Sequence, residues 1–265
     1  MDSNVGADSN ARAHRVVTAG QIAFAVTMIG IGILGLVQGH FTPTWAGVPA
    51  TFPARKTLAY LSALVSLAAG IGLLVPRAAA SASRALLGAF TVWLLLFRVP
   101  VVFRALGDSG AWWAVGDSAV MIGAAWVLYV WFTGERSPLG TGKTGLRIAR
   151  ALYGLGLIPF GVAHFTYLAR TVSMVPAWLP WHLMWADLFG VTFIAAGVAA
   201  ITGVWGRLAV GLSAVQLGLF TLLVWGPVAV GGRATASDWA ETVSSCVLTV
   251  AAWVVAESYR VSTQV

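Results

Sequence analysis

Charged residues are scarce in this chain, and cysteine is almost absent. Only 9% of the 265 residues are charged, whereas a soluble domain carries about 25%, so the composition excludes a soluble protein. The one cysteine, Cys246, excludes an internal disulfide. It equally excludes a CxxC redox pair or a thiolate zinc cluster supplied by this chain alone.

Recognisable cofactor motifs are missing as well. The stretch Gly140-Thr141-Gly142-Lys143-Thr144 imitates a phosphate-binding loop. However, Ser137 stands where that motif needs a glycine, and no β-strand pattern precedes it. We therefore expect no nucleotide, no metal and no other cofactor.

Hydrophobic residues dominate the chain, at 58% of all positions. They form repeated runs of about 20 residues, the length that crosses a bilayer core of about 30 Å as a helix. The net charge of +7 comes from basic residues in short loops at the ends of these runs. Membrane insertion explains such a distribution, so nucleic acid is not an expected partner.

The apolar runs predict an all-α integral membrane protein with eight transmembrane helices. Helices are required because each span must satisfy its own backbone in lipid, and the runs are too long for barrel strands. The spans are expected near residues 17–39, 57–75, 84–106, 112–132, 147–168, 183–203, 207–230 and 238–258.

The chain also contains an internal repeat. Val48–Pro53 (VPATFP) returns as Val175–Pro180 (VPAWLP), and a His-Phe pair precedes each copy, at His40 and His164. The histidines are 124 residues apart and the later markers 127, so one three-residue insertion aligns the halves. A repeat in a membrane protein usually places its site between or within the repeats.

These patterns predict two parallel four-helix repeats, residues 17–133 and 147–259, joined by a cytoplasmic linker at 134–146. Residues 1–16 are expected to form a disordered cytoplasmic tail without a cleavable signal peptide. Ten basic residues fall on the side of the termini and six on the other side, which favours a multi-pass cell-membrane protein with both termini cytoplasmic. Four spans per repeat is an even number, so both halves share one orientation.

Ionisable residues inside the spans are the candidate site. His40, Asp117, His164, Asp187 and Glu241 all fall toward the extracytoplasmic half in this topology. Such groups are costly in lipid and therefore face the bundle interior or water. A structural role is the alternative, because histidines near an interface can cap helices and carboxylates in a first turn stabilise a helix amino terminus.

Asp187 is the strongest of these candidates, because it lies within an apolar and aromatic run. Desolvation favours the neutral form of a carboxylic acid, which is a potential proton donor. Several tryptophans accompany the acids. An interfacial aromatic belt explains many of them, but indole faces can also line a pocket and stabilise a cation; the candidates are Trp178, Trp181, Trp185, Trp225 and Trp239.

The second repeat resembles the DoxX-like family of small membrane proteins. The resemblance rests on a glycine-rich first span ending in His-Phe (Gly161–Phe165), the Val175–Pro180 turn, and a basic turn at Gly203–Arg207. Family members are typically one four-helix unit, so this chain resembles a fused pair. Many members carry a glutamate early in the second span, near Asp187 here, while Tyr60 holds that place in repeat one. The family link implies quinone-coupled redox complexes.

Three functions are compatible with these observations. The first is a membrane enzyme that protonates and cyclises a lipophilic, isoprenoid-type substrate, with Asp187 as the acid, Glu241 or His164 as its partner or final base, and tryptophans around the cation. The second is a quinone-linked redox subunit that needs a membrane partner subunit. The third is a small-solute transporter or a scaffold.

Overall fold

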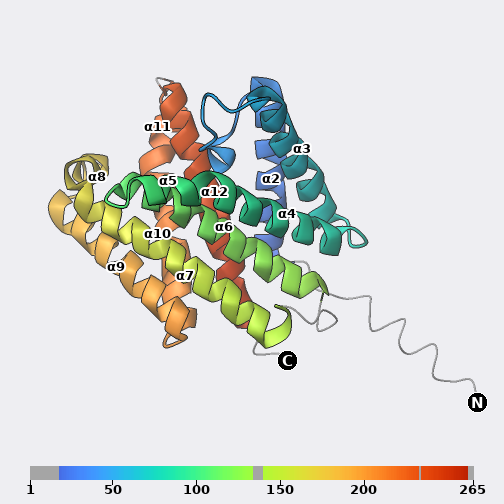
Figure 1. Ribbon diagram of the computed structural model, residues 1–265. Coiled ribbons are helices and arrows are strands. Elements are labelled where there is room, and N and C mark those ends of the chain that lie inside the picture. Colours follow the sequence, from blue (N-terminus) through green and yellow to red (C-terminus); the bar gives the residue numbers. More distant parts are fainter. Residues whose placement is uncertain (1–17, 134–139, 233, 262–265) are drawn as a thin grey trace, which may run out of the picture.

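The protein is an all-helical bundle in the computed structural model, which describes residues 18–133, 140–232 and 234–261 (Figure 1). No strand occurs within these ranges. Eight helices in the described part of the chain are long and apolar enough to cross a membrane, which confirms the predicted fold class. They span Ala19–Gln38, Arg55–Leu74, Ala79–Arg104, Ser109–Thr133, Gly142–Thr166, His182–Thr202, Gly206–Val230 and Ala236–Arg260. The tail expected at 1–16 lies outside the described residues.

Within the first half, three spans are continuous and one is interrupted. The elements are α2 (Ala19–Gln38), the 3-10 turn η1 (Pro43–Trp45), α3 (Arg55–Leu74), α4 (Ala79–Trp93), the π-helical turn η2 (Leu94–Arg98), α5 (Val99–Arg104) and α6 (Ser109–Thr133).

The second half repeats this order. Its elements are α7 (Gly142–Thr166), α8 (Leu168–Met174), α9 (His182–Thr202), α10 (Gly206–Phe220), the π-helical turn η4 (Thr221–Trp225), α11 (Gly226–Val230) and α12 (Ala236–Val261). Helix α7 begins at Gly142, five residues before the predicted span. Lys143 and Arg147 are therefore helical, and long basic side chains at a span end can reach the headgroups.

The halves share local backbone features at the predicted offset of 127 residues. The π-helical turns begin at Leu94 and Thr221, and each is followed by a proline at the second position of the next helix. Ala54 and Trp181, also 127 apart, both adopt left-handed backbone immediately before the second span of their half. The repeat is therefore present in the coordinates as well as in the sequence.

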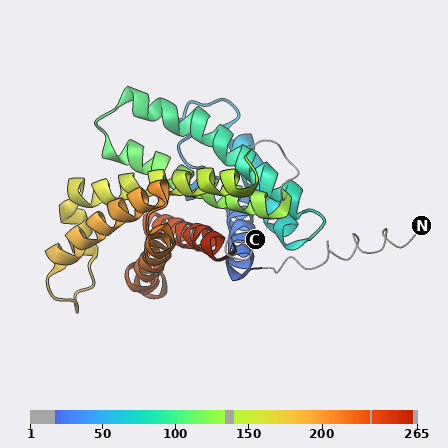
Figure 2. The same ribbon diagram turned by 90° about the horizontal axis from the view of Figure 1, so that it is seen from below.

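The same helix pairs pack together in both halves. Helix α2 contacts α3, α3 contacts α4 and α4 contacts α6, as α7 contacts α9, α9 contacts α10 and α10 contacts α12. The last helices of the halves, α6 and α12, also contact each other, and both views place α12 between α2 and α10 (Figures 1 and 2). The two repeats thus meet where α6 contacts α7 and α12, and where α2 contacts α12.

Glycine pairs allow the helices nearest this junction to approach closely. A Cβ on Gly116 of α6 would lie 2.7 Å from the carbonyl oxygen of Gly156 of α7, and the reverse is also 2.7 Å. Small residues at such crossings let backbones touch where lipid gives no hydrophobic drive for association. This crossing fixes the position of the next residue, Asp117.

Candidate functional site

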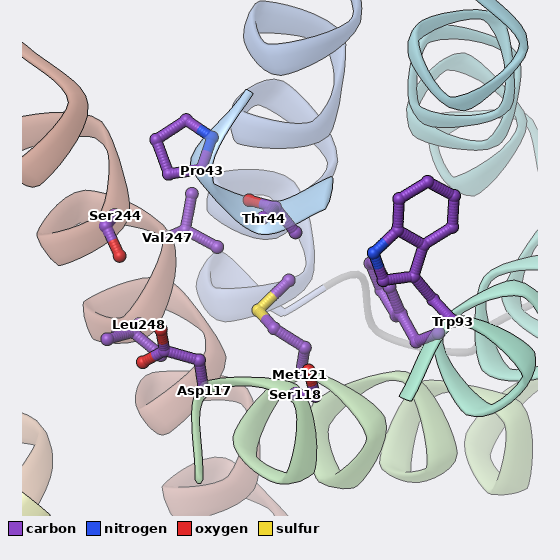
Figure 3. A pocket seen from close by; sticks show the side chains of 10 residues that line it. Pro43, Thr44, Trp93, Asp117, Ser118, Met121, Ser244, Val247 and Leu248 are labelled. Atoms are coloured by element: carbon purple, nitrogen blue, oxygen red, sulfur yellow. The ribbon is translucent and has the colours of Figure 1, made fainter. Parts of the chain in front are cut away.

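A small hollow lies at the junction of the two repeats (Figure 3). Its volume is about 20 Å³, enough for about one water molecule. Four parts of the chain form its wall, namely α4, α6, α12 and the segment before α3. The lining residues are Pro43, Thr44, Phe90, Trp93, Asp117, Ser118, Met121, Ser244, Val247 and Leu248.

The hollow is lined by equivalent positions of the two repeats. Asp117 and Ser244 are 127 residues apart, as are Met121 and Leu248, and all four line it. Residues spaced by four on a helix share one face, so α6 and α12 present corresponding faces to this space. The hollow therefore lies between the repeats, where repeat architecture places membrane sites.

Asp117 is the one acidic residue among the described residues that line this hollow. Its side chain extends from α6 toward α12, on the far side of the hollow from Trp93 (Figure 3). Its Oδ1 atom is inaccessible to solvent and has no hydrogen-bond partner in the described part of the chain. Arg98 and Glu241 are close enough to act on it electrostatically. A buried carboxylate oxygen without a partner is costly, which is typical of a site rather than of a packing residue.

Residues 39–47, which we call the roof segment, close the hollow on the side opposite the described chain ends. Trp45 of this segment is 2% exposed and donates a hydrogen bond from Nε1 to Ser66 Oγ over 2.7 Å. It stacks on Phe90 at a centroid distance of 4.9 Å. Trp93 donates from Nε1 to the Ala46 carbonyl oxygen over 3.2 Å. Aromatic packing thus holds Pro43 and Thr44 over the hollow.

Arg98 connects this roof to the helices beneath it. The residue ends the π-helical turn η2, is 9% exposed, and donates from Nη2 to the Pro43 carbonyl oxygen at 3.4 Å. A Cβ on Gly47 would lie 3.2 Å from its Cδ atom, so the roof segment passes directly over the arginine. Its Nε atom is buried without a partner among the described residues. π-helical turns of this kind frequently occur at functional sites.

The acids and histidines predicted in the second repeat do not line this hollow. His164 is buried between α7 and α9, where its Nδ1 is 2.8 Å from the Phe160 carbonyl oxygen and its ring lies 5.5 Å from that of Phe193. Asp187 is half-buried on α9, between the exposed Leu183 and Leu188. The structure therefore does not bring Asp187 and His164 together at this hollow.

Glu241 lies at the edge of the site. Its Oε1 is 4.0 Å from Nη2 of Arg170 on α8, and the two side chains are 46% and 65% exposed. It stands three residues before Ser244 on α12, and so lies about one turn from the hollow. His40, at the start of the roof segment, is exposed, with Nδ1 3.3 Å from the Phe41 carbonyl oxygen.

The five predicted tryptophans are dispersed. Trp178 and Trp181 are 70% and 73% exposed, and Trp239 is 50% exposed. Trp185 is half-buried, with no hydrogen-bond partner in the described ranges for its Nε1. Trp225 is buried and occupies the position equivalent to Arg98, 127 residues later. None of the five lines the hollow.

The aromatic wall of the hollow comes instead from Phe90 and Trp93 of α4, and Thr44 adds a hydroxyl group to its lining. Our sequence analysis selected none of these three residues. Ser244 was detectable, because adding the repeat offset to Asp117 gives its number. No local pattern in the sequence indicates that the segment around Thr44 folds inward.

No protein-family model, curated protein or solved structure matches this chain. The interpretation of the site therefore depends on its own geometry. That geometry offers one carboxylate, hydroxyl groups and two aromatic rings around a small space.

Proposed function

We propose that this protein is an integral membrane enzyme that transfers a proton to and from a lipophilic, isoprenoid-type substrate, with Asp117 as the acid–base group. The observation that carries the proposal is the buried, unpartnered Oδ1 of Asp117 in a hollow walled by Phe90 and Trp93. A carboxyl group held away from water is suited to proton transfer, and aromatic faces stabilise a cation.

The proposed chemistry needs no second reactant. A neutral Asp117 gives its proton to a carbon–carbon double bond, and the electron pair of that bond forms the new carbon–hydrogen bond. The resulting carbocation shifts or cyclises beside Phe90 and Trp93. Loss of a proton from a neighbouring carbon forms a new double bond and returns the proton to the carboxylate, so the product is an isomer of the substrate.

The hollow at about 20 Å³ is smaller than the several hundred Å³ of a ligand pocket. The structure therefore corresponds, in this proposal, to a closed form of the site. Helices α6 and α12 meet at the hollow, and the roof segment covers it. In this proposal, a small movement of the roof segment away from these helices enlarges the space without unfolding either half.

The orientation in the membrane belongs to the same proposal. An even number of spans puts both described chain ends on one face, and the excess of basic residues on that face favours the cytoplasm. The roof segment then faces outward. An impermeant thiol reagent added to intact cells should label an exposed Ser237→Cys at the start of α12, in a Cys246→Ser background; labelling only in inverted vesicles would reverse the orientation.

The test is product analysis of cells that also express a prenyl donor pathway. Lipid extracts of the wild type should contain an isomer, detected by mass spectrometry, that Asp117→Asn lowers by at least about a hundredfold, within the range contributed by acid–base groups. Asp187→Asn is the matched control and should retain the product. Full product with Asp117→Asn, or its loss only with Asp187→Asn, would contradict the proposed role.

A quinone-linked redox subunit is the second candidate. Arg98 Nε is an unused donor and Asp117 Oδ1 an unused acceptor in the same region of the bundle, and a quinone head presents an acceptor as a quinone and a donor when reduced. The resemblance to DoxX-like proteins favours this candidate. It predicts that the purified protein binds a quinone, with quenching of tryptophan fluorescence that Asp117→Asn weakens, while no isomer forms in cells.

A further inference from the structure

Side-chain hydrogen bonds and aromatic contacts attach the roof segment to the bundle. Three of the hydrogen bonds involve helix side chains: Trp45 Nε1 to Ser66 Oγ at 2.7 Å, Trp93 Nε1 to the Ala46 oxygen at 3.2 Å, and Arg98 Nη2 to the Pro43 oxygen at 3.4 Å. The third is long for a hydrogen bond. Apart from the 3-10 turn Pro43–Trp45, the segment contains no helix. It can therefore move without unfolding a transmembrane helix, once the ring contacts of Trp45 with Phe90 and Trp93 are broken.

Glycines with left-handed backbone lie at both ends of this segment. Gly39 has φ of 68° and Gly47 has φ of 102°. Other residues rarely adopt these values, and short positions that absorb changes of backbone angle serve as hinges in closing loops. The roof segment is therefore bounded by two points at which the chain can turn.

The closed position leaves polar groups without partners. Oγ1 of Thr42 and Oγ1 of Thr44 are buried and unbonded, and so is Nε of Arg98, among the residues that the structure describes. Burial of an unpaired polar group is unfavourable. If the segment opened to water, all three groups could form hydrogen bonds. The closed state therefore carries the free-energy cost of these unpaired groups, which the aromatic packing of the segment must exceed.

The second repeat supplies an internal comparison. Its corresponding connection contains α8 and the exposed Trp178 and Trp181, and none of its residues lines the hollow. Where the first repeat has Arg98, the second has Trp225. An inward connection thus occurs in the repeat that carries the arginine.

We propose that the roof segment is a lid over Asp117 and that Arg98 is the positioning residue that latches it. The role of the lid in catalysis rests on the proposed function. The movement of the lid does not depend on it. Arg98 holds the Pro43 carbonyl oxygen from below and is close enough to Asp117 to act on it electrostatically. A substrate that binds the Asp117 carboxylate changes the electrostatic interaction between Asp117 and Arg98. Binding in the hollow is thereby coupled to the hydrogen bond between Arg98 and the lid.

The test measures access to the hollow with a thiol reagent. Ser244 lines the hollow, so Ser244→Cys in a Cys246→Ser background reports whether a reagent larger than water enters. With the parent lid, we expect slow labelling by a methanethiosulfonate reagent. Arg98→Gln should raise the labelling rate about tenfold, and Arg98→Lys, which keeps the charge and a donor, should give an intermediate rate.

Three controls separate a released lid from a damaged fold. Arg104→Gln changes an exposed arginine of α5 and should leave the rate at the parent value. Ser237→Cys, exposed on α12, should react fast in every background. Ser66→Ala removes the acceptor for Trp45, together with a bond from Ser66 Oγ to the Ser62 carbonyl oxygen within α3, and should also speed labelling at Ser244→Cys.

Parent rates in both Arg98→Gln and Ser66→Ala would overturn the lid, even if Asp117→Asn abolishes the product. Labelling that is faster in Arg98→Gln than in Arg98→Lys, with the parent rate in Arg104→Gln, would support it, even if no product is found. If Arg98→Gln does not yield folded protein, the Ser66→Ala rate alone decides the outcome.

Discussion

At the residue scale, the decisive neighbours are Gly116 and Asp117 on α6. The glycine permits the close crossing with α7, where a Cβ would lie 2.7 Å from the Gly156 oxygen. The aspartate that follows it then points into the hollow (Figure 3). Adjacent residues of α6 therefore have different roles: Gly116 permits the packing against α7, and Asp117 supplies the carboxyl group of the hollow.

Replacement of Gly116 by alanine should separate α6 from α7 and lower stability by about 1–3 kcal/mol, because a methyl group has no room against a backbone oxygen. Gly88→Ala on α4 is the matched control, since nothing lies within 4 Å of its added Cβ, and it should be neutral or slightly stabilising. Thermal unfolding in detergent measures both. Equal stability of the two variants would contradict the tight crossing.

At the scale of elements, the first and last helices that the structure describes, α2 and α12, are joined by a side chain. Glu257 of α12 is 9% exposed, and its Oε1 accepts a hydrogen bond from the backbone N–H of Gly20, at 3.1 Å. Gly20 lies in the first turn of α2, where N–H groups lack helical partners and a negative charge is favourable. This contact ties α2 of the first repeat to α12 of the second.

Glu257→Gln keeps the shape of the side chain but removes its charge, and we expect a loss of about 1–2 kcal/mol. The comparison is Glu241→Gln, whose ion pair with Arg170 is exposed and should contribute less than about 1 kcal/mol. Unfolding by heat under identical detergent conditions ranks the two. A larger loss of stability for Glu241→Gln than for Glu257→Gln would show that the contact between α2 and α12 contributes little to stability.

At the scale of the whole molecule, the sequence predicted the helices and the repeat because both depend on long patterns. Apolar runs determine the spans, and the offset of 127 residues reappears in the π-helical turns. The site was predicted only in part. Asp117 was among the predicted residues, but the second repeat was favoured because Asp187 lies in a more aromatic run. The hollow is formed by contacts between the repeats and by the roof segment around Trp45. No local pattern in the sequence specifies these contacts.

We propose, above all, that one site lies between the repeats at equivalent positions 117 and 244. The most direct measurement compares product formation by Asp117→Ser and by the double variant Asp117→Ser/Ser244→Asp, which moves the carboxylate to the other side of the same hollow. The account predicts loss of product in the single variant and recovery of at least about one-tenth of wild-type product in the double variant. Full product in the single variant, or a folded double variant as inactive as the single one, would contradict it.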